Sequence, residues 1–266
     1  MPAKPPVVMS TLSQIIQSFS VAEGFNTPPN WRQGRTIYGG LSVALALQAA
    51  LQAGPADLPP LKSAQILFVG PGVDGLSFKA QVLRQGKSAT MIAVDGMEDD
   101  KLMLRVCFLF AHPRDSAVQH DLSAHPVVKP PAGCPRLQET AQTPSHLSNF
   151  EIRWAGPNLP VSGSEHPEFL AWVRHHDASS VDPAVALLAL GDCLPPGAMA
   201  CFKSFAPISS ITWNLDLAMP APSGDWFLLR STSQRARNGY SFQTMDMWDA
   251  HDQLILAGSQ TVAIFA

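Results

Sequence analysis

The stretch Thr36–Ala50, TIYGGLSVALALQAA, places two glycines directly before a run that is apolar on nearly every side. After Gly40, only Ser42 and Gln48 interrupt the apolar and small residues of this stretch. A surface helix normally carries one apolar stripe, whereas a helix that is apolar all round needs cover all round. The stretch therefore predicts a central helix that other parts of the chain enclose.

A membrane span does not explain this run. Leu41–Leu51 is shorter than the roughly 20 residues that a bilayer requires, and the chain start, MPAKPPVVMSTL, lacks the apolar core of an export signal. The 266 residues are 46% hydrophobic and 15% charged, which is typical of a soluble globular protein of one large or two small domains. A net charge of −3 gives no basic surplus for nucleic acid.

The four cysteines do not form a recognisable metal or disulfide pattern. Cys107, Cys134, Cys193 and Cys201 include no CxxC pair and have no histidine partners at zinc-ligand spacing. The adjacent histidines of VRHHD, Val173–Asp177, would point to opposite faces of a strand. We therefore expect reduced thiols in a cytoplasmic protein, with no metal and no cofactor.

Each half of the chain predicts one apolar helix and several strands. The second helix lies in DPAVALLALGDCLPPG, Asp182–Gly197, with Asp182 as N-cap and Pro183 in the first turn. A strand, PEFLAWVRHH, precedes it. Other β-rich runs bounded by turn residues lie at 63–72, 76–96, 99–111, 210–219, 225–250 and 252–265. Each half is therefore an α+β unit with an antiparallel sheet.

The two units also resemble each other in sequence. Asp100–Leu104, DKLML, and Asp252–Leu256, DQLIL, lie 152 positions apart, and Gly86 and Gly239 lie 153 apart. Eight of the 24 prolines fall between residues 113 and 160, which indicates a long connection. We expect an N-terminal unit at 1–112, a connecting segment at 113–149 and a C-terminal unit at 150–266. Sheets placed edge to edge would remove two open edges.

Several of these motifs together resemble a known family. TIYGGLSVALALQAA, FVGPG and VLRQGKSATMIAV are similar to the first half of acyl-CoA thioesterase II proteins. DWFLLRSTSQRARNGYSFQTMDMWDAHDQLILAGSQ resembles the last part of the same family. The resemblance covers roughly residues 15–112 and 150–264. It implies a double hot-dog fold, in which two helices are each wrapped by antiparallel sheet and joined in one continuous curved sheet.

The resemblance also implies an activity and three catalytic residues. The activity is hydrolysis of acyl-CoA to free acid and CoA without a cofactor, within fatty acid metabolism. Asp192 in LALGDCLPP, Ser210 in SSITW and Gln260 in LAGSQ match the residues that hold and activate the attacking water. The best-known members have Thr where Ser210 stands and Asp where Thr212 stands. Ser210 keeps the hydroxyl group of the family's Thr, whereas Thr212 lacks the carboxylate of the family's Asp.

These residue types suit thioester hydrolysis. An aspartate in a poorly solvated groove can act as general base, while Gln and Ser orient the water. Backbone N–H groups at a helix start are candidate oxyanion donors, and Gly39 and Gly40 allow a substrate close to the backbone. We therefore expect Tyr38, Gly39 and Gly40 at the mouth of an acyl-CoA groove. Which helix start faces the scissile carbonyl stays open.

Plainer interpretations exist for each site residue. Asp192 could simply end its helix, Ser210 could bond across strands and Gln260 could face solvent, while the glycines could form only a turn. A catalytically silent acyl-CoA-binding protein would keep the groove and lose the activated water. A hot-dog enoyl-CoA hydratase would need a histidine near a helix, and neither apolar helix contains one. The acyl chain length and the pathway stay open, and a homo-oligomer is compatible with the sequence.

Overall fold

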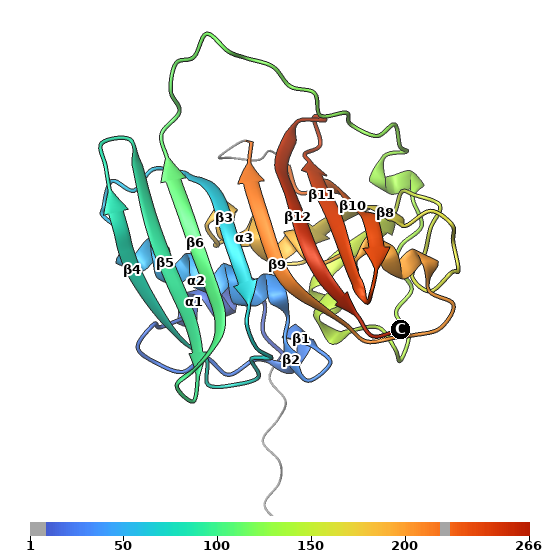
Figure 1. Ribbon diagram of the computed structural model, residues 1–266, viewed down its shortest axis with the longest axis horizontal. Helices are drawn as coiled ribbons and strands as arrows, with labels where there is room; N and C mark the ends of the chain where they lie inside the picture. Colours follow the sequence, from blue (N-terminus) through green and yellow to red (C-terminus); the bar gives the residue numbers. More distant parts are fainter. Residues whose placement is uncertain (1–8, 219–223) are drawn as a thin grey trace, which may run out of the picture.

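One ten-stranded antiparallel sheet runs through the computed structural model, which describes residues 9–218 and 224–266 (Figure 1). Its strand order is β4-β5-β6-β3-β9-β12-β11-β10-β8-β7. The first half contributes β3 (Leu61–Phe68), β4 (Ser77–Gln85), β5 (Ala89–Glu98) and β6 (Lys101–Ala111). The second half contributes β7 (Phe150–Trp154), β8 (Glu168–His175), β9 (Ile208–Leu217), β10 (Phe227–Arg237), β11 (Tyr240–Trp248) and β12 (Leu254–Ile264). Met219, the last residue of one expected strand, lies outside the described residues.

The two halves join where β3 pairs with β9, from Ser63 opposite Asp216 to Leu67 opposite Thr212. On either side of this pair the order is the same, since β3-β6-β5-β4 in one direction matches β9-β12-β11-β10 in the other. The repeated segment 100–104 opens β6 and its copy at 252–256 opens β12. The expected double hot-dog is confirmed, including the single continuous sheet.

The first central helix is α2, Gly39–Ala53, which begins three residues later than the sequence pattern predicted. Thr36–Ile37 instead forms β2, which pairs with β1 at Arg32–Gln33, and the Tyr38 N–H donates to the Trp31 carbonyl at 2.9 Å. The two glycines are therefore the first turn of the helix. Ten of its 15 residues are buried, as an enclosed helix requires.

The second central helix, α3, is shorter than predicted and spans Pro183–Gly191. The Asp182 carboxylate accepts from the N–H groups of Ala184 and Val185 at 2.9 and 3.3 Å, which confirms the predicted N-cap. Pro195 and Pro196 follow closely, and proline cannot continue a helix. A 3-10 turn, η4, then spans Gly197–Cys201.

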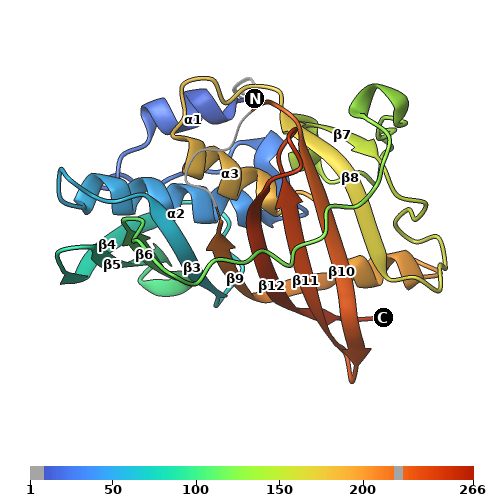
Figure 2. The ribbon, with the colours of Figure 1, turned by 90° about the horizontal axis from the view of Figure 1, so that it is seen from above.

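Besides β1 and β2, the sequence patterns do not predict α1 or β7. A short helix, α1 (Leu12–Ser18), has a capping box between Thr11 and Gln14 and buries Leu12 and Ile15. Strand β7 lies within the proline-rich stretch 113–160, which the sequence pattern indicated to be a connection. Figure 2 shows α1, α2 and α3 on the same side of the sheet, with β7 and β8 at one end of it. Within the described residues, no helix is long and apolar enough to cross a membrane.

The part of the connecting segment around Lys129 and Cys134 packs on the opposite face of the sheet. Between β6 and β7 it has no regular structure apart from the 3-10 turns η2 (Pro131–Gly133) and η3 (Ser145–Asn149). Trp172 Nε1 donates to the Lys129 carbonyl at 2.8 Å, and Cys134 is buried with Trp172 and Trp248 in a small apolar cluster. This part of the segment thus covers the outer side of the second half. The unit boundaries at 112 and 149 stay predictions.

A partly exposed histidine beside α3, whose ring contacts this helix, makes stability depend on pH. His175 Nε2 lies 2.8 Å from the Ala186 carbonyl oxygen, and burial lowers the pKa of this imidazole to about 4. A histidine whose pKa is lowered by folding stabilises the fold fully above its unfolded pKa, and this stabilisation is lost as pH falls through the folded pKa.

We therefore expect the wild type to lose stability relative to His175→Gln between pH 6.5 and pH 4, by up to about 3 kcal/mol. Denaturant unfolding of both proteins over this range measures the difference. His176→Gln, at the exposed next position, is the matched control. A difference between wild type and His175→Gln that does not vary with pH would contradict the assignment.

Candidate active site

Asp192 and Gln260 meet although 68 residues separate them. Asp192 is the residue that ends α3, and Gln260 lies on the inner face of β12, where it is 3% exposed. Gln260 Nε2 donates to Asp192 Oδ1 at 2.9 Å. The structure therefore brings together two of the three residues that the resemblance implied.

The start of α2 completes the surroundings of this carboxylate. The backbone N–H of Gly40 donates a hydrogen bond to it, and the positive end of the helix dipole favours the same negative charge. A Cβ atom on Gly39 would lie 2.6 Å from Asp192 Oδ2 and 3.4 Å from the Phe68 ring. Gly39 is therefore required because the carboxylate occupies the space of a side chain.

Tyr38 does not lie at an open mouth, which corrects the sequence-based expectation. Its side chain is fully buried, and its hydroxyl donates to the Ala189 carbonyl in α3 at 2.8 Å. Its ring stacks on His146 with 4.3 Å between centroids. A Cβ on Gly40 would come within 2.6 Å of the same ring. Tyr38 thus fastens the start of α2 to the end of α3, and Gly40 makes room for it.

Ser210 shares a face with Gln260 without bonding to it. Ser210 stands opposite Val262 on β12, and Gln260 stands opposite Trp213, with a bulge at Ile211 between the two pairs. Val262 and Gln260 are both buried on the inner face, so Ser210 lies on that face as well and is partly exposed. Among the described residues, no hydrogen bond joins the Ser210 hydroxyl to Asp192 or Gln260.

Thr212 lies on the other face of the sheet. It precedes Trp213, whose side chain is fully buried on the inner face, and successive strand residues point to opposite faces. Its side chain therefore points away from Asp192. The loss of a carboxylate at this position does not change the surroundings of Asp192 in this structure.

Burial raises the pKa of Asp192 to about 7, although the hydrogen bonds from Gln260 and Gly40 act in the opposite direction. A carboxylate with a pKa near neutrality can accept a proton from water and return it within one cycle. Burial also raises the pKa of the neighbouring Cys193 thiol far above its usual range. Cys193 is therefore protonated and unsuited to nucleophilic attack.

Sequence reasoning missed Gln243, which contacts Gln260 directly. Gln243 is 1% exposed on β11, and its Nε2 donates to Gln260 Oε1 at 2.6 Å. The available signal was strand alternation, because Gln243 occupies the same phase as Ser241, Met245 and Met247. An amide at a core position of an amphipathic strand needs a buried partner.

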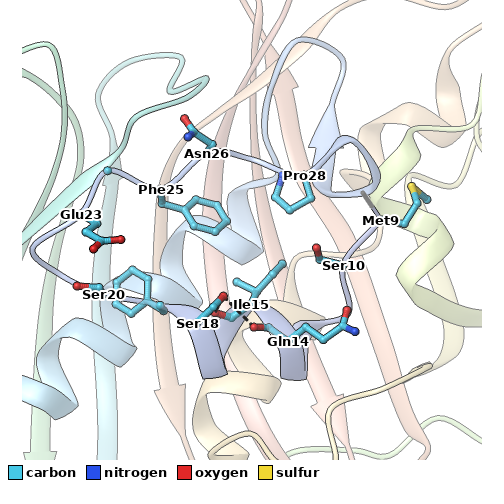
Figure 3. Close-up of a pocket in the computed structure, with 12 residues that line it drawn as sticks. Met9, Ser10, Gln14, Ile15, Ser18, Ser20, Glu23, Phe25, Asn26 and Pro28 are labelled. Atoms are coloured by element: carbon cyan, nitrogen blue, oxygen red, sulfur yellow. Dashed lines mark hydrogen bonds between the residues drawn. The ribbon is translucent and has the colours of Figure 1, made fainter. Parts of the chain in front are cut away.

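A separate cavity of about 490 Å³ lies along α1. Figure 3 shows the side chains of Ile15 and Phe25 between this helix and the following loop, with Glu23 at one side. Its lining residues fall between Met9 and Pro28, so they include none of the residues around the Asp192 carboxylate.

Comparisons with known proteins agree with this fold. Residues 27–111 match the sequence profile of the acyl-CoA thioesterase N-terminal domain, and residues 131–264 match that of the C-terminal domain. The chain therefore belongs to the acyl-CoA thioesterase family and is a hydrolase of acyl-CoA thioesters.

Individual relatives are distant in sequence. Acyl-CoA thioesterase 2 of Haemophilus influenzae is 23% identical over 254 residues, which are 85% of this chain and 86% of that protein. A hot-dog protein of unknown function from Alicyclobacillus acidocaldarius has a TM-score of 0.81 and 20% identity, over 91% of this chain and 92% of that one. The acyl-CoA thioesterase II TesB2 from Mycobacterium marinum has a TM-score of 0.72 and 16% identity, over 91% and 93%.

Gly39→Ala tests the contact between α2 and the carboxylate. The added Cβ would displace Asp192 Oδ2, so we expect hydrolysis to fall by about 10²-fold, as for a misplacement of about 1 Å. Stability should change little, because alanine favours helix. Gly191→Ala is the matched control, since the atoms nearest to its Cβ would be those of the Trp213 ring at 3.4 Å and of Leu256 at 3.8 Å, which are ordinary van der Waals contacts. Equal activity of the two variants would contradict the assignment.

Asp192→Asn tests the buried charge through stability. A carboxylate whose pKa is raised by folding binds its proton more tightly in the folded state, so stability falls as pH rises from about 4 to about 7. Asparagine does not titrate. We expect the variant to gain stability relative to the wild type over this range, by the order of 4 kcal/mol, and the difference to level off above it. Chemical denaturation at several pH values measures this, and a difference independent of pH would argue against a raised pKa.

Proposed function

We propose that this protein hydrolyses acyl-CoA with a water molecule activated by Asp192, Ser210 and Gln260. The observation that carries the proposal is the Asp192 carboxylate, which accepts from the Gln260 amide and the Gly40 N–H while burial raises its pKa to about 7. A base of this pKa is half ionised near neutral pH, where general base catalysis is most effective.

In this mechanism Asp192 takes a proton from the water as the oxygen attacks the thioester carbonyl carbon. The carbonyl oxygen becomes an oxyanion in a tetrahedral intermediate. Collapse of the intermediate breaks the carbon–sulfur bond, and Asp192 returns the proton to the departing CoA sulfur. The products are the free acid and CoA, and the carboxylate is restored for the next cycle.

The other residues orient the reacting atoms. Gln260 uses one N–H on Asp192 and has a second N–H for the water or the oxyanion, while the Ser210 hydroxyl can donate or accept. Gly39 and Gly40 are proposed to let the thioester approach the first turn of α2. The N–H groups of this turn other than that of Gly40, which bonds to Asp192, suit a developing negative charge. Phe68 is proposed as one wall, because its ring lies beside Gly39.

Finer assignments follow from the same proposal. We propose a role in fatty acid metabolism, which the substrate class supports. Its four cysteines are free thiols, which supports a cytoplasmic location. The β4–β5 hairpin leaves Val82, Leu83 and Met91 exposed, which is compatible with assembly into a homo-oligomer.

The test follows release of the CoA thiol from a panel of acyl-CoA esters with a thiol reagent. We expect kcat/KM to rise with pH through about 7 and then to level off, because the base must be ionised. Asp192→Asn should lower activity by about 10² or more, and Ser210→Ala should cost less.

Asp216→Asn, at an exposed position of β9, is the control and should behave as the wild type. Full hydrolysis by Asp192→Asn would refute the proposed base. Tight binding of acyl-CoA without thiol release by the wild type would favour a silent binding protein instead.

A further inference from the structure

A chain of three hydrogen bonds, two of them buried and the third partly buried, leads from Gly197 through Gln243 and Gln260 to the Asp192 carboxylate. The Gly197 N–H donates to Gln243 Oε1 at 3.0 Å, and Gln243 Nε2 donates to Gln260 Oε1 at 2.6 Å. Gln260 Nε2 then donates to Asp192 Oδ1 at 2.9 Å. All three bonds run in the same direction, toward the carboxylate, and bonds aligned in this way polarise one another.

We propose that Gln243 is a positioning residue of the hydrolytic site, which acts by fixing the orientation of the Gln260 amide. This inference rests on the proposed function of Asp192 and Gln260. Gln243 itself does not touch the carboxylate, so it works only through its neighbour.

The two ends of this hydrogen-bond chain, Gly197 and Asp192, determine how both amides are oriented. A backbone N–H can only donate, so the carbonyl oxygen of Gln243 must face Gly197 and its NH₂ must face Gln260. An ionised carboxylate can only accept, so the NH₂ of Gln260 must face Asp192. Gln260 is therefore held as a donor, and its second N–H is the group that it offers to a reacting oxygen.

The anchor of this chain is tightly packed. A Cβ on Gly197 would lie 2.5 Å from the Pro167 carbonyl oxygen and 2.7 Å from that of Ser231, so η4 rests directly on the backbone of β10. The Gly197 N–H also lies 3.1 Å from Ser231 Oγ. Gly197, the residue at which the hydrogen-bond chain begins, therefore has little freedom to move.

The first half of the molecule shows that the fold does not need these amides. Gln243 and Gln260 face each other across β11 and β12, four residues from the bulge at Met247. The equivalent pair in the first half, four residues from the bulge at Gly96, is Ile92 opposite Phe108. Both are fully buried. The same position thus accepts an apolar pair, and buried amides are costly unless bonded. We infer that the amides serve the site.

Gln243→Leu tests the inference, since it keeps a similar volume and resembles the first half. Gln260 should lose its fixed orientation, so we expect kcat to fall by about 10- to 100-fold with KM near that of the wild type. The acidic limb of the pH–rate profile and the ¹³C titration of the Asp192 carboxyl should both move to higher pH, because the Gln260 hydrogen bond lowers this pKa.

Ser241→Ala is the matched control. Ser241 lies on the same strand and face as Gln243, is fully buried and bonds to Ser233 at 2.8 Å, so its loss should leave the titration unchanged. If Gln243→Leu does not fold, Gln243→Met gives the same test with an unbranched side chain. The double variant Gln243→Leu with Gln260→Leu should be no slower than Gln260→Leu alone, because the first residue acts through the second.

Additive losses in the double variant, or an Asp192 titration in Gln243→Leu that equals that of Ser241→Ala, would overturn the inference. The titration separates this result from the fate of the proposed function. A wild type that releases no thiol would refute the hydrolytic role, whereas a shifted Asp192 titration in Gln243→Leu would still support the positioning of Gln260 by Gln243.

Discussion

The site depends on the close approach of the Asp192 carboxylate to the first turn of α2. At Gly39 the carboxylate oxygen lies where a side chain would begin, and at Gly40 the Tyr38 ring does the same. The Tyr38 hydroxyl bonds to Ala189 and holds the two helices in this position. A negative charge at a helix start is favourable, yet burial raises the pKa of Asp192 to about 7. The balance of these effects gives Asp192 a pKa near neutrality, which suits the proposed role of general base.

The two halves share one scaffold, whereas the residues of the proposed site differ between them. Both halves provide a helix and a matching set of strands, and even their bulges correspond at Gly96 and Met247. The first half fills one inner cross-strand position with apolar side chains, while the second half fills it with two amides. Among the described residues, the hydrogen-bond chain of Gln243, Gln260 and Asp192 therefore lies in the second half, and the first half contributes the start of α2 to the site.

Much of this architecture was predictable from local sequence patterns. An all-apolar helix, the Asp182 cap and the repeat at Asp100 and Asp252 specify helices, strands and duplication, because period and turn residues are local properties. The sequence does not predict the short helix α1 or strand β7, because elements of seven and five residues show little hydrophobic periodicity. The prediction that Tyr38 lies at an open groove mouth was wrong, because its burial depends on His146 and Ala189, which are distant in sequence. The bond between Gln243 and Gln260 depends likewise on strand register, which the pattern of either strand alone does not fix.

The most direct test is a crystal structure with an unreactive acyl-CoA analogue in which a methylene group replaces the thioester sulfur. The mechanism predicts a water within hydrogen-bonding distance of Asp192 and roughly 3 to 3.5 Å from the carbonyl carbon. It also predicts the carbonyl oxygen near the start of α2 or the free N–H of Gln260. An analogue whose carbonyl lies far from Asp192, such as in the cavity along α1, would contradict the assignment of this carboxylate as the base.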